Sequence, residues 1–102
     1  MSLAIENFSQ MQFQNKMLVL GDMLELGDEA FKEHALILQL LREKKLEDYI
    51  LVGPIFSALQ KEKSFAASNQ ALAYLQSHPV KQKTVLIKGS RGISLEEVVP
   101  AF

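Results

Sequence analysis

Two apolar runs, each followed by a short polar loop that contains glycine, constrain the fold of this chain more than any other feature. Residues 17–20 continue into the acidic loop 21–27, and residues 85–87 continue into the basic loop 88–92. A strand that is buried on both faces of a parallel sheet is a continuous apolar run of this kind. α/β proteins bind ligands where such strands end. We therefore expect two loops of opposite charge at the same edge of one sheet.

The rest of the chain alternates between short apolar runs and helical patterns, which predicts an α/β fold. The expected strands are residues 16–21, 48–52, 64–67 and 84–87. The expected helices are residues 2–13, about 29–45, the single turn 56–60, residues 69–77 and a last helix that opens at Ser94. Together they predict a three-layer sandwich with a mostly parallel sheet of about four strands.

Residue spacing also predicts which helix faces are buried. The expected apolar faces are Ala4, Phe8 and Met11 in the first helix, and Phe31, Ala35, Leu38 and Leu41 in the second. Asp28 is placed to cap the second helix, and Ser94 and Glu97 have the spacing of a capping box. His34 is expected to be a partly buried helical residue rather than a general base, because no partner lies near it in sequence.

Composition argues against several classes of function. The formal net charge of −1 is unlike that of a nucleic-acid-binding domain, which normally carries a basic face. The chain has no cysteine, and its two histidines lack metal-ligand spacing, so we expect no metal site from this chain alone. No apolar run approaches the ~20 residues of a membrane-spanning helix. The length of 102 residues is enough for one domain.

The acidic loop has two interpretations. In the functional one, Gly21 lets the backbone approach a ligand, and Asp22 or Glu25 accepts hydrogen bonds from an amine, a hydroxyl or a bound cation. In the structural one, the loop is a plain strand-to-helix connection in which Asp22 caps local amides. The sheet edge is then covered by Met23, Leu24 and Leu26.

The basic loop also has two interpretations. Consecutive N–H groups in a glycine-rich turn can bind an anion, and Lys88 and Arg91 add positive charge. Alternatively the glycines only serve the turn, and Arg91 pairs with Glu96 or Glu97 at the surface. The loop is not a P-loop, and the chain has no Gly-x-Gly-x-x-Gly fingerprint, so no motif supports nucleotide binding by this chain alone.

The chain resembles the carboxy-terminal domain of the Mur ligases over nearly its whole length. The resemblance rests on Leu-Gly-Asp-Met-Leu-Glu-Leu-Gly at residues 20–27 with His34 downstream, Val-Leu-Ile-Lys-Gly-Ser-Arg-Gly at 85–92 and Leu-Glu-Glu-Val at 95–98. It implies a Rossmann-like domain of a three-domain enzyme. It also implies that the family's first strand, in an Asp-x-Tyr-Asn-Ala-Asn-Pro segment, would precede residue 1 and is absent here.

The resemblance further implies a function. Mur ligases of the most similar branch are cytoplasmic enzymes of peptidoglycan synthesis that join D-alanyl-D-alanine to a UDP-muramoyl-tripeptide. They use ATP and magnesium, which the central domain mainly binds, and the carboxy-terminal domain closes over ATP and helps to position the incoming amine. On this basis residues 1–102 are one domain, inactive alone and without a catalytic residue of its own.

The positions that match the family's motifs are the expected substrate-binding residues, namely Asp22, Met23, Glu25, Lys88, Ser90 and Arg91. We expect the basic loop to face an anionic group, either the dipeptide carboxylate or an ATP phosphate. The acidic loop would then line the pocket on the amine side.

Three other interpretations remain beside this one. The chain can be the carboxy-terminal domain of another Mur-type amide ligase, or a non-catalytic α/β interaction module whose loops stay empty. A phosphoacceptor receiver domain is disfavoured, because Gly53-Pro54 follows the middle strand where such a domain needs an aspartate. If a strand is missing, an exposed sheet edge invites self-association.

Overall fold

The structure is a computed structural model that describes residues 2–11 and 15–101, apart from the side chains of residues 2, 25, 26, 91, 100 and 101. The helices are α1 (Ser2–Gln10), α2 (Ala30–Glu43), α3 (Pro54–Leu59) and α4 (Ser68–Ser77). Short 3-10 helices are η1 (Leu24–Glu29), η2 (Arg91–Ile93) and η3 (Leu95–Ala101). The strands are β1 (Lys16–Gly21), β2 (Tyr49–Val52), β3 (Ser64–Phe65) and β4 (Thr84–Lys88).

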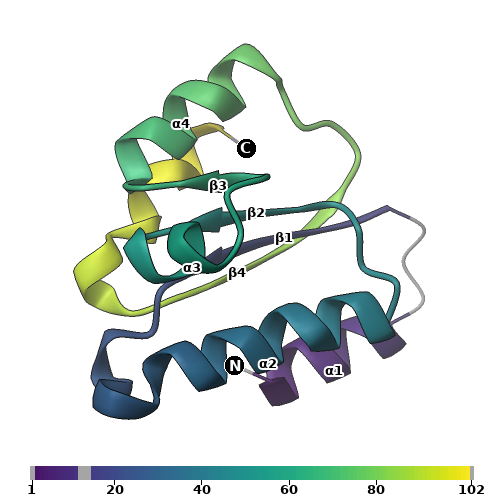
Figure 1. Cartoon of the computed structure of the whole chain (residues 1–102). Helices are drawn as coiled ribbons and strands as arrows, with labels where there is room; N and C mark the ends of the chain where they lie inside the picture. The colour runs from purple at the N-terminus through teal and green to yellow at the C-terminus, as the bar shows by residue number, and fades with distance from the viewer. Residues whose placement is uncertain (1, 12–14, 102) are drawn as a thin grey trace.

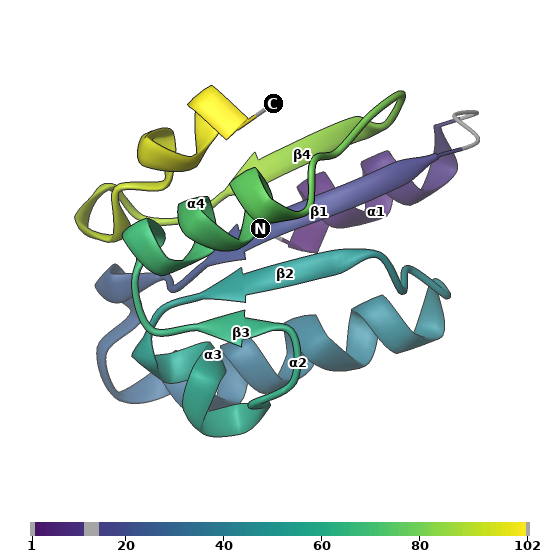
Figure 2. The ribbon, with the colours of Figure 1, turned by 90° about the horizontal axis from the view of Figure 1, so that it is seen from above.

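The four strands form one sheet in the order β3-β2-β1-β4, and all neighbours are parallel. Helices α1 and α2 cover one face, while α4 and η3 cover the other (Figures 1 and 2). The predicted three-layer α/β fold with about four strands is therefore confirmed. No described helix is long and apolar enough to cross a membrane.

Strand β1 supplies side chains to both layers of the core, as an apolar run in a central strand should. Leu18 and Leu20 pack with α1, α2 and α3, whereas Met17 and Val19 pack with α4 and η3. Strand β4 is also apolar, but it lies at the edge of the described sheet and its side chains at residues 84–87 are only half-buried.

The predicted helix faces were partly wrong. In α1, Ile5 and Phe8 are buried, whereas Met11 lies beyond the helix and is 47% exposed. In α2 the buried residues are Ala30, His34, Ile37, Leu38 and Leu41, so the core face is rotated from the predicted one. Phe31 is 56% exposed and Ala35 is also exposed. The rotation brings His34, rather than Phe31, against the end of β1.

Both predicted helix caps were also wrong. Asp28 lies inside η1, and the residue before α2 is Glu29, which makes no side-chain cap hydrogen bond. Ser94 has a φ of 58°, and its carbonyl oxygen accepts the N–H of Glu97. The chain there continues as the 3-10 helix η3 instead of an α-helix.

Candidate functional site

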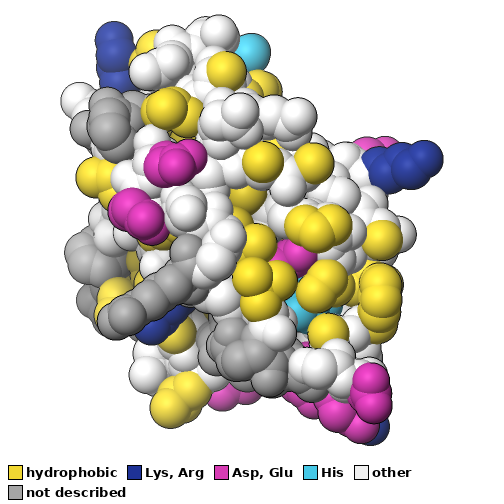
Figure 3. All heavy atoms as spheres, turned by 90° about the vertical axis from the view of Figure 1, so that its left-hand side faces the viewer, with side chains coloured by type: hydrophobic (Ala, Val, Ile, Leu, Met, Phe, Trp, Pro, Cys, Tyr) yellow, Lys and Arg dark blue, Asp and Glu magenta, His cyan; other side chains and the backbone are white. Residues whose placement is uncertain are grey.

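The two loops predicted from the sequence lie side by side at the carboxyl end of the sheet. In the strand register Leu20 is the partner of Lys88, so β1 and β4 end next to each other. Figure 3 shows the molecule from this edge, with hydrophobic side chains gathered on it. Two apolar side chains that follow β1 in the chain, Leu24 in η1 and Phe31 in α2, are 49% and 56% exposed.

Hydrogen bonds join the two loops directly. The N–H of Leu24 donates to Oγ of Ser90 over 2.8 Å, and the N–H of Ser90 donates to the carbonyl oxygen of Asp22 over 3.1 Å. Gly89 permits this approach, because a Cβ there would lie 2.9 Å from Cα of Gly21 and 2.7 Å from the Leu95 side chain. The loops therefore form one unit, which we call the carboxyl rim and define as residues 21–24 and 88–90.

The side chain of Asp22, a residue of this rim, is buried. Its carboxylate accepts the N–H of Ile55 over 2.7 Å and that of Phe56 over 3.0 Å, so it caps the start of α3 from a distant strand. Gly53, with a φ of 127°, makes room for it, because a Cβ there would overlap the carboxylate. Asp22 is 0% exposed. The prediction that it lines a substrate pocket does not fit this geometry, since the protein itself occupies both oxygens.

His34 lies beside Asp22 and is also 0% exposed. Its Nδ1 is 2.5 Å from the carbonyl oxygen of Ala30, and its Nε2 accepts the N–H of Met23 over 3.0 Å. The ring meets Phe56 edge-on at 4.5 Å between centroids. Nε2 is 3.9 Å from Oδ1 of Asp22, too far for a hydrogen bond. From the sequence we expected a partly buried helical residue and did not predict the hydrogen bond between His34 and Met23.

The other predicted site residues differ in accessibility. Lys88 is exposed at the end of β4, and Ser90 is half-buried where it bridges the loops. Met23 is half-buried and its side chain packs against the core, while its backbone N–H donates to His34. The side chains of Glu25 and Arg91 lie outside the described residues, so their predicted contacts stay predictions.

The described residues do not fit a magnesium site. No group of three or more His, Asp or Glu side chains that could hold a metal ion occurs among them. The Asp22 carboxylate, which belongs to the rim, is already held by two backbone N–H groups. A divalent cation at this edge would therefore need ligands from elsewhere.

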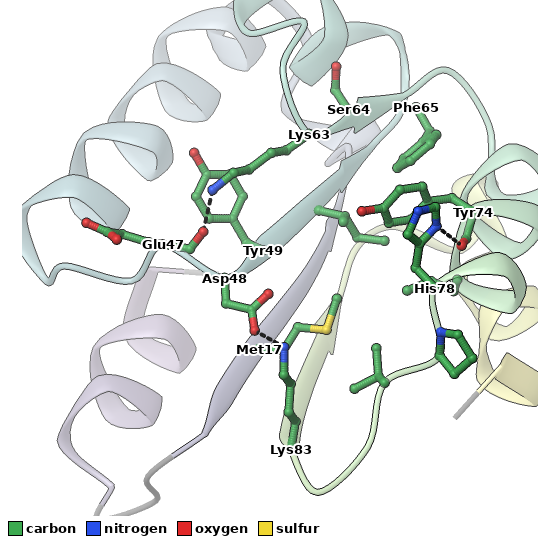
Figure 4. A pocket seen from close by; sticks show the side chains of 14 residues that line it. Met17, Glu47, Asp48, Tyr49, Lys63, Ser64, Phe65, Tyr74, His78 and Lys83 are labelled. Atoms are coloured by element: carbon green, nitrogen blue, oxygen red, sulfur yellow. Dashed lines mark hydrogen bonds and ion pairs between the residues drawn. The ribbon is translucent and has the colours of Figure 1, made fainter.

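A groove of about 680 Å³ lies at the opposite edge, where the strands begin (Figure 4). An aromatic wall forms one side, with Tyr74 between Phe65 at 5.2 Å and His78 at 4.2 Å. Lys83 pairs with Asp48 at 2.5 Å on its rim. None of the residues predicted to bind substrate lines this groove.

Comparison with known proteins shows relatives among the Mur ligases. The UDP-N-acetylmuramoyl-tripeptide–D-alanyl-D-alanine ligase of Buchnera aphidicola is 32% identical over 90 residues, which cover 82% of this chain and 20% of that enzyme. The ligase of the same name from Rickettsia prowazekii is 27% identical, and the match covers 100% of this chain and 24% of that enzyme. No protein-family model matches the chain.

A solved structure shares the fold. The MurF ligase of Thermotoga maritima, determined in complex with ADP, matches with a TM-score of 0.74 at 23% identity, over 97% of this chain and 24% of that one. The chain thus spans about a fifth to a quarter of the length of the relatives it matches. These matches confirm the resemblance to the Mur ligases that the two loop motifs indicated.

Proposed function

We propose that this chain, a relative of the Mur ligases, is the carboxy-terminal domain of the ligase that joins D-alanyl-D-alanine to UDP-N-acetylmuramoyl-tripeptide. Two relatives that carry this name cover 82% and 100% of the chain. The observation that carries the proposal is the joining of the two motif loops into one rim, through Leu24, Ser90 and Asp22. Such ligases act in the cytoplasm during peptidoglycan synthesis.

In this proposal the domain helps to position the incoming amine and closes over ATP, and it supplies no catalytic residue. An acyl-phosphate formed with ATP is open to hydrolysis, so a domain that covers it excludes water until the amine displaces phosphate. The described residues fit neither a P-loop nor a magnesium site. ATP and magnesium are therefore bound mainly by the rest of the longer protein, and we assign this chain no step through the metal.

Within the rim we propose separate tasks for the predicted residues. Lys88, exposed at the end of β4, faces an anionic group, which is the dipeptide carboxylate or an ATP phosphate. Arg91 acts beside it, and Glu25 lies on the amine side. Ser90 fixes the distance between the loops, and Asp22 supports the rim from below.

A chimeric ligase tests this function. The portion of the Thermotoga maritima MurF ligase that matches this chain is replaced by residues 1–102, and phosphate release from ATP is measured with UDP-muramoyl-tripeptide. We expect release that depends on D-alanyl-D-alanine, and none from the isolated chain. Turnover by the isolated chain would refute the proposal. A folded but inactive chimera would support an interaction module, and a preference for another amine would indicate another Mur branch.

The outer edge of β4 is a second feature with a functional consequence. Among the described strands β4 pairs only with β1, and its apolar residues 85–87 are half-buried. We propose that the isolated chain associates with itself through this edge, because unpaired N–H and C=O groups invite strand pairing. Sedimentation should show a mass that rises with concentration, whereas a strict monomer across a wide concentration range would contradict it.

A further inference from the structure

His34 connects helix α2 to the carboxyl rim through a hydrogen bond. It lies in α2, yet its Nε2 accepts a hydrogen bond from Met23 in the carboxyl rim, eleven positions earlier. We propose that His34 is a positioning residue, a neutral imidazole protonated on Nδ1 that sets the backbone of the rim. This inference depends on the proposed function for its purpose but not for its geometry.

The hydrogen-bond partners determine the protonation of the ring. The Ala30 carbonyl oxygen can only accept, so Nδ1, at 2.5 Å from it, carries a proton. The Met23 N–H can only donate, so Nε2 presents a lone pair. A second proton on Nε2 would turn the acceptor into a donor and break the bond to Met23. The ring therefore serves as an acceptor inside the core.

The bond to Met23 completes a row of three fixed residues. The Asp22 carboxylate is held by the first N–H groups of α3, the Met23 N–H by α2, and the Leu24 N–H by Ser90 of the basic loop. Each consecutive residue is thus tied to a different element. Removing the acceptor from His34 frees the middle residue of the row, and the loop that meets Ser90 loses its support on the α2 side.

A packing role for His34 makes a different prediction. The imidazole is 0% exposed and meets Phe56 edge-on, so it also fills space. If filling space were its only task, two polar replacements of similar character would act alike. The positioning role requires instead that an acceptor stands where Nε2 stands now.

NMR spectroscopy of the 102-residue chain tests the proposal. With ¹⁵N-labelled histidine, the ring of His34 should show a protonated Nδ1 and an unprotonated Nε2. The opposite tautomer, or a doubly protonated ring at neutral pH, would overturn the proposal. This spectrum needs no variant, so it decides the question even if substitutions prevent folding.

A matched pair of variants adds a readout of backbone positioning. His34→Gln places an amide oxygen near the position of Nε2, whereas His34→Asn keeps a donor near Nδ1 and has no atom at Nε2. Hydrogen exchange of the Met23 amide should be about tenfold faster in His34→Asn than in His34→Gln. The amides of Val19 and Leu20 in β1 serve as controls and should change alike. Equal Met23 exchange in the two variants would leave only the packing role. Since neither readout involves ATP or an amide product, each can succeed or fail independently of the proposed ligase function.

Discussion

The two ends of the sheet, the carboxyl end and the amino end of its strands, use polar residues in opposite ways. At the carboxyl rim, Asp22 and the neighbouring His34 of α2 are 0% exposed and bond to the backbone of the protein itself. At the amino edge, Lys83 and Asp48 pair in the open, with side chains 34% and 44% exposed beside a groove of about 680 Å³. The rim thus has fixed geometry, whereas the amino edge has a hollow bounded by exposed charges.

Under the proposed function, the hollow and the site lie at opposite ends of the strands. A positioning domain needs a backbone that is held in place, and buried side chains that lock loops together provide this. In the proposed ligase the substrate lies between the rim and the rest of the longer protein, so this domain supplies only one wall. The groove at the amino edge has none of the motif residues, so cavity size and the motif residues select opposite ends of the strands.

Asp22→Ala should produce the largest loss of stability. It removes the buried acceptor of two N–H groups at the start of α3, and the free energy of unfolding should fall by about 3 kcal/mol. The matched control is Asp48→Ala at the amino edge, where an exposed ion pair contributes about 0–1 kcal/mol. Urea unfolding measures both, and equal losses would remove the contrast between the edges.

Gly53→Ala should have the next largest effect. Its φ of 127° is unfavourable for any side chain, and a Cβ would overlap the Asp22 carboxylate, so we expect a loss of about 2–3 kcal/mol. Gly27→Ala is the control, since Gly27 has a φ of 57° and nothing within 4 Å of an added Cβ. Its ψ of −128° also favours glycine, so it should lose about 1–2 kcal/mol for the backbone conformation alone and less than Gly53→Ala. If the two variants unfold at the same urea concentration, the overlap with Asp22 is unimportant.

Ser90→Ala should have a smaller effect, confined to the rim. Loss of its Oγ removes the acceptor of the Leu24 N–H, for about 1 kcal/mol, and the Leu24 amide should exchange faster with solvent. Ser64→Ala is the control at the amino edge, where an exposed Oγ donates to Lys61. It should leave Leu24 exchange unchanged. Unaltered exchange in Ser90→Ala would show that the loops are not joined through this side chain.

The sheet could be predicted from the sequence because its central strands are continuous apolar runs. Residues 16–21 were predicted as a strand and form β1 with the same bounds. The buried face of α2 could not be predicted, because its apolar residues fit either of two neighbouring faces of the helix. Phe31 looks like a core residue, but the stripe through His34 is buried. An imidazole is stable in the core only when its ring nitrogens have hydrogen-bond partners. The fold brings Met23 and Ala30 to His34 as those partners.

For the candidate site, the sequence predicted where the two loops lie but not how their side chains are oriented. The glycine and charge pattern placed both loops at one edge, since parallel strands end together. The same pattern cannot say whether a carboxylate faces outward. Asp22 turns inward because its carboxylate accepts two N–H groups of α3. These groups lie 33 and 34 positions away in sequence, so no local pattern encodes the contact.

The most direct test of the central claim compares one lysine from each edge in the chimeric ligase. Lys88→Ala should lower kcat/KM for D-alanyl-D-alanine or ATP by about 10- to 100-fold, the loss of one charged contact of about 1–3 kcal/mol. Lys83→Ala, beside the groove at the amino edge, should leave kcat/KM unchanged. Unchanged kinetics in Lys88→Ala, or an equal loss in Lys83→Ala, would contradict the assignment of the carboxyl rim as the functional edge.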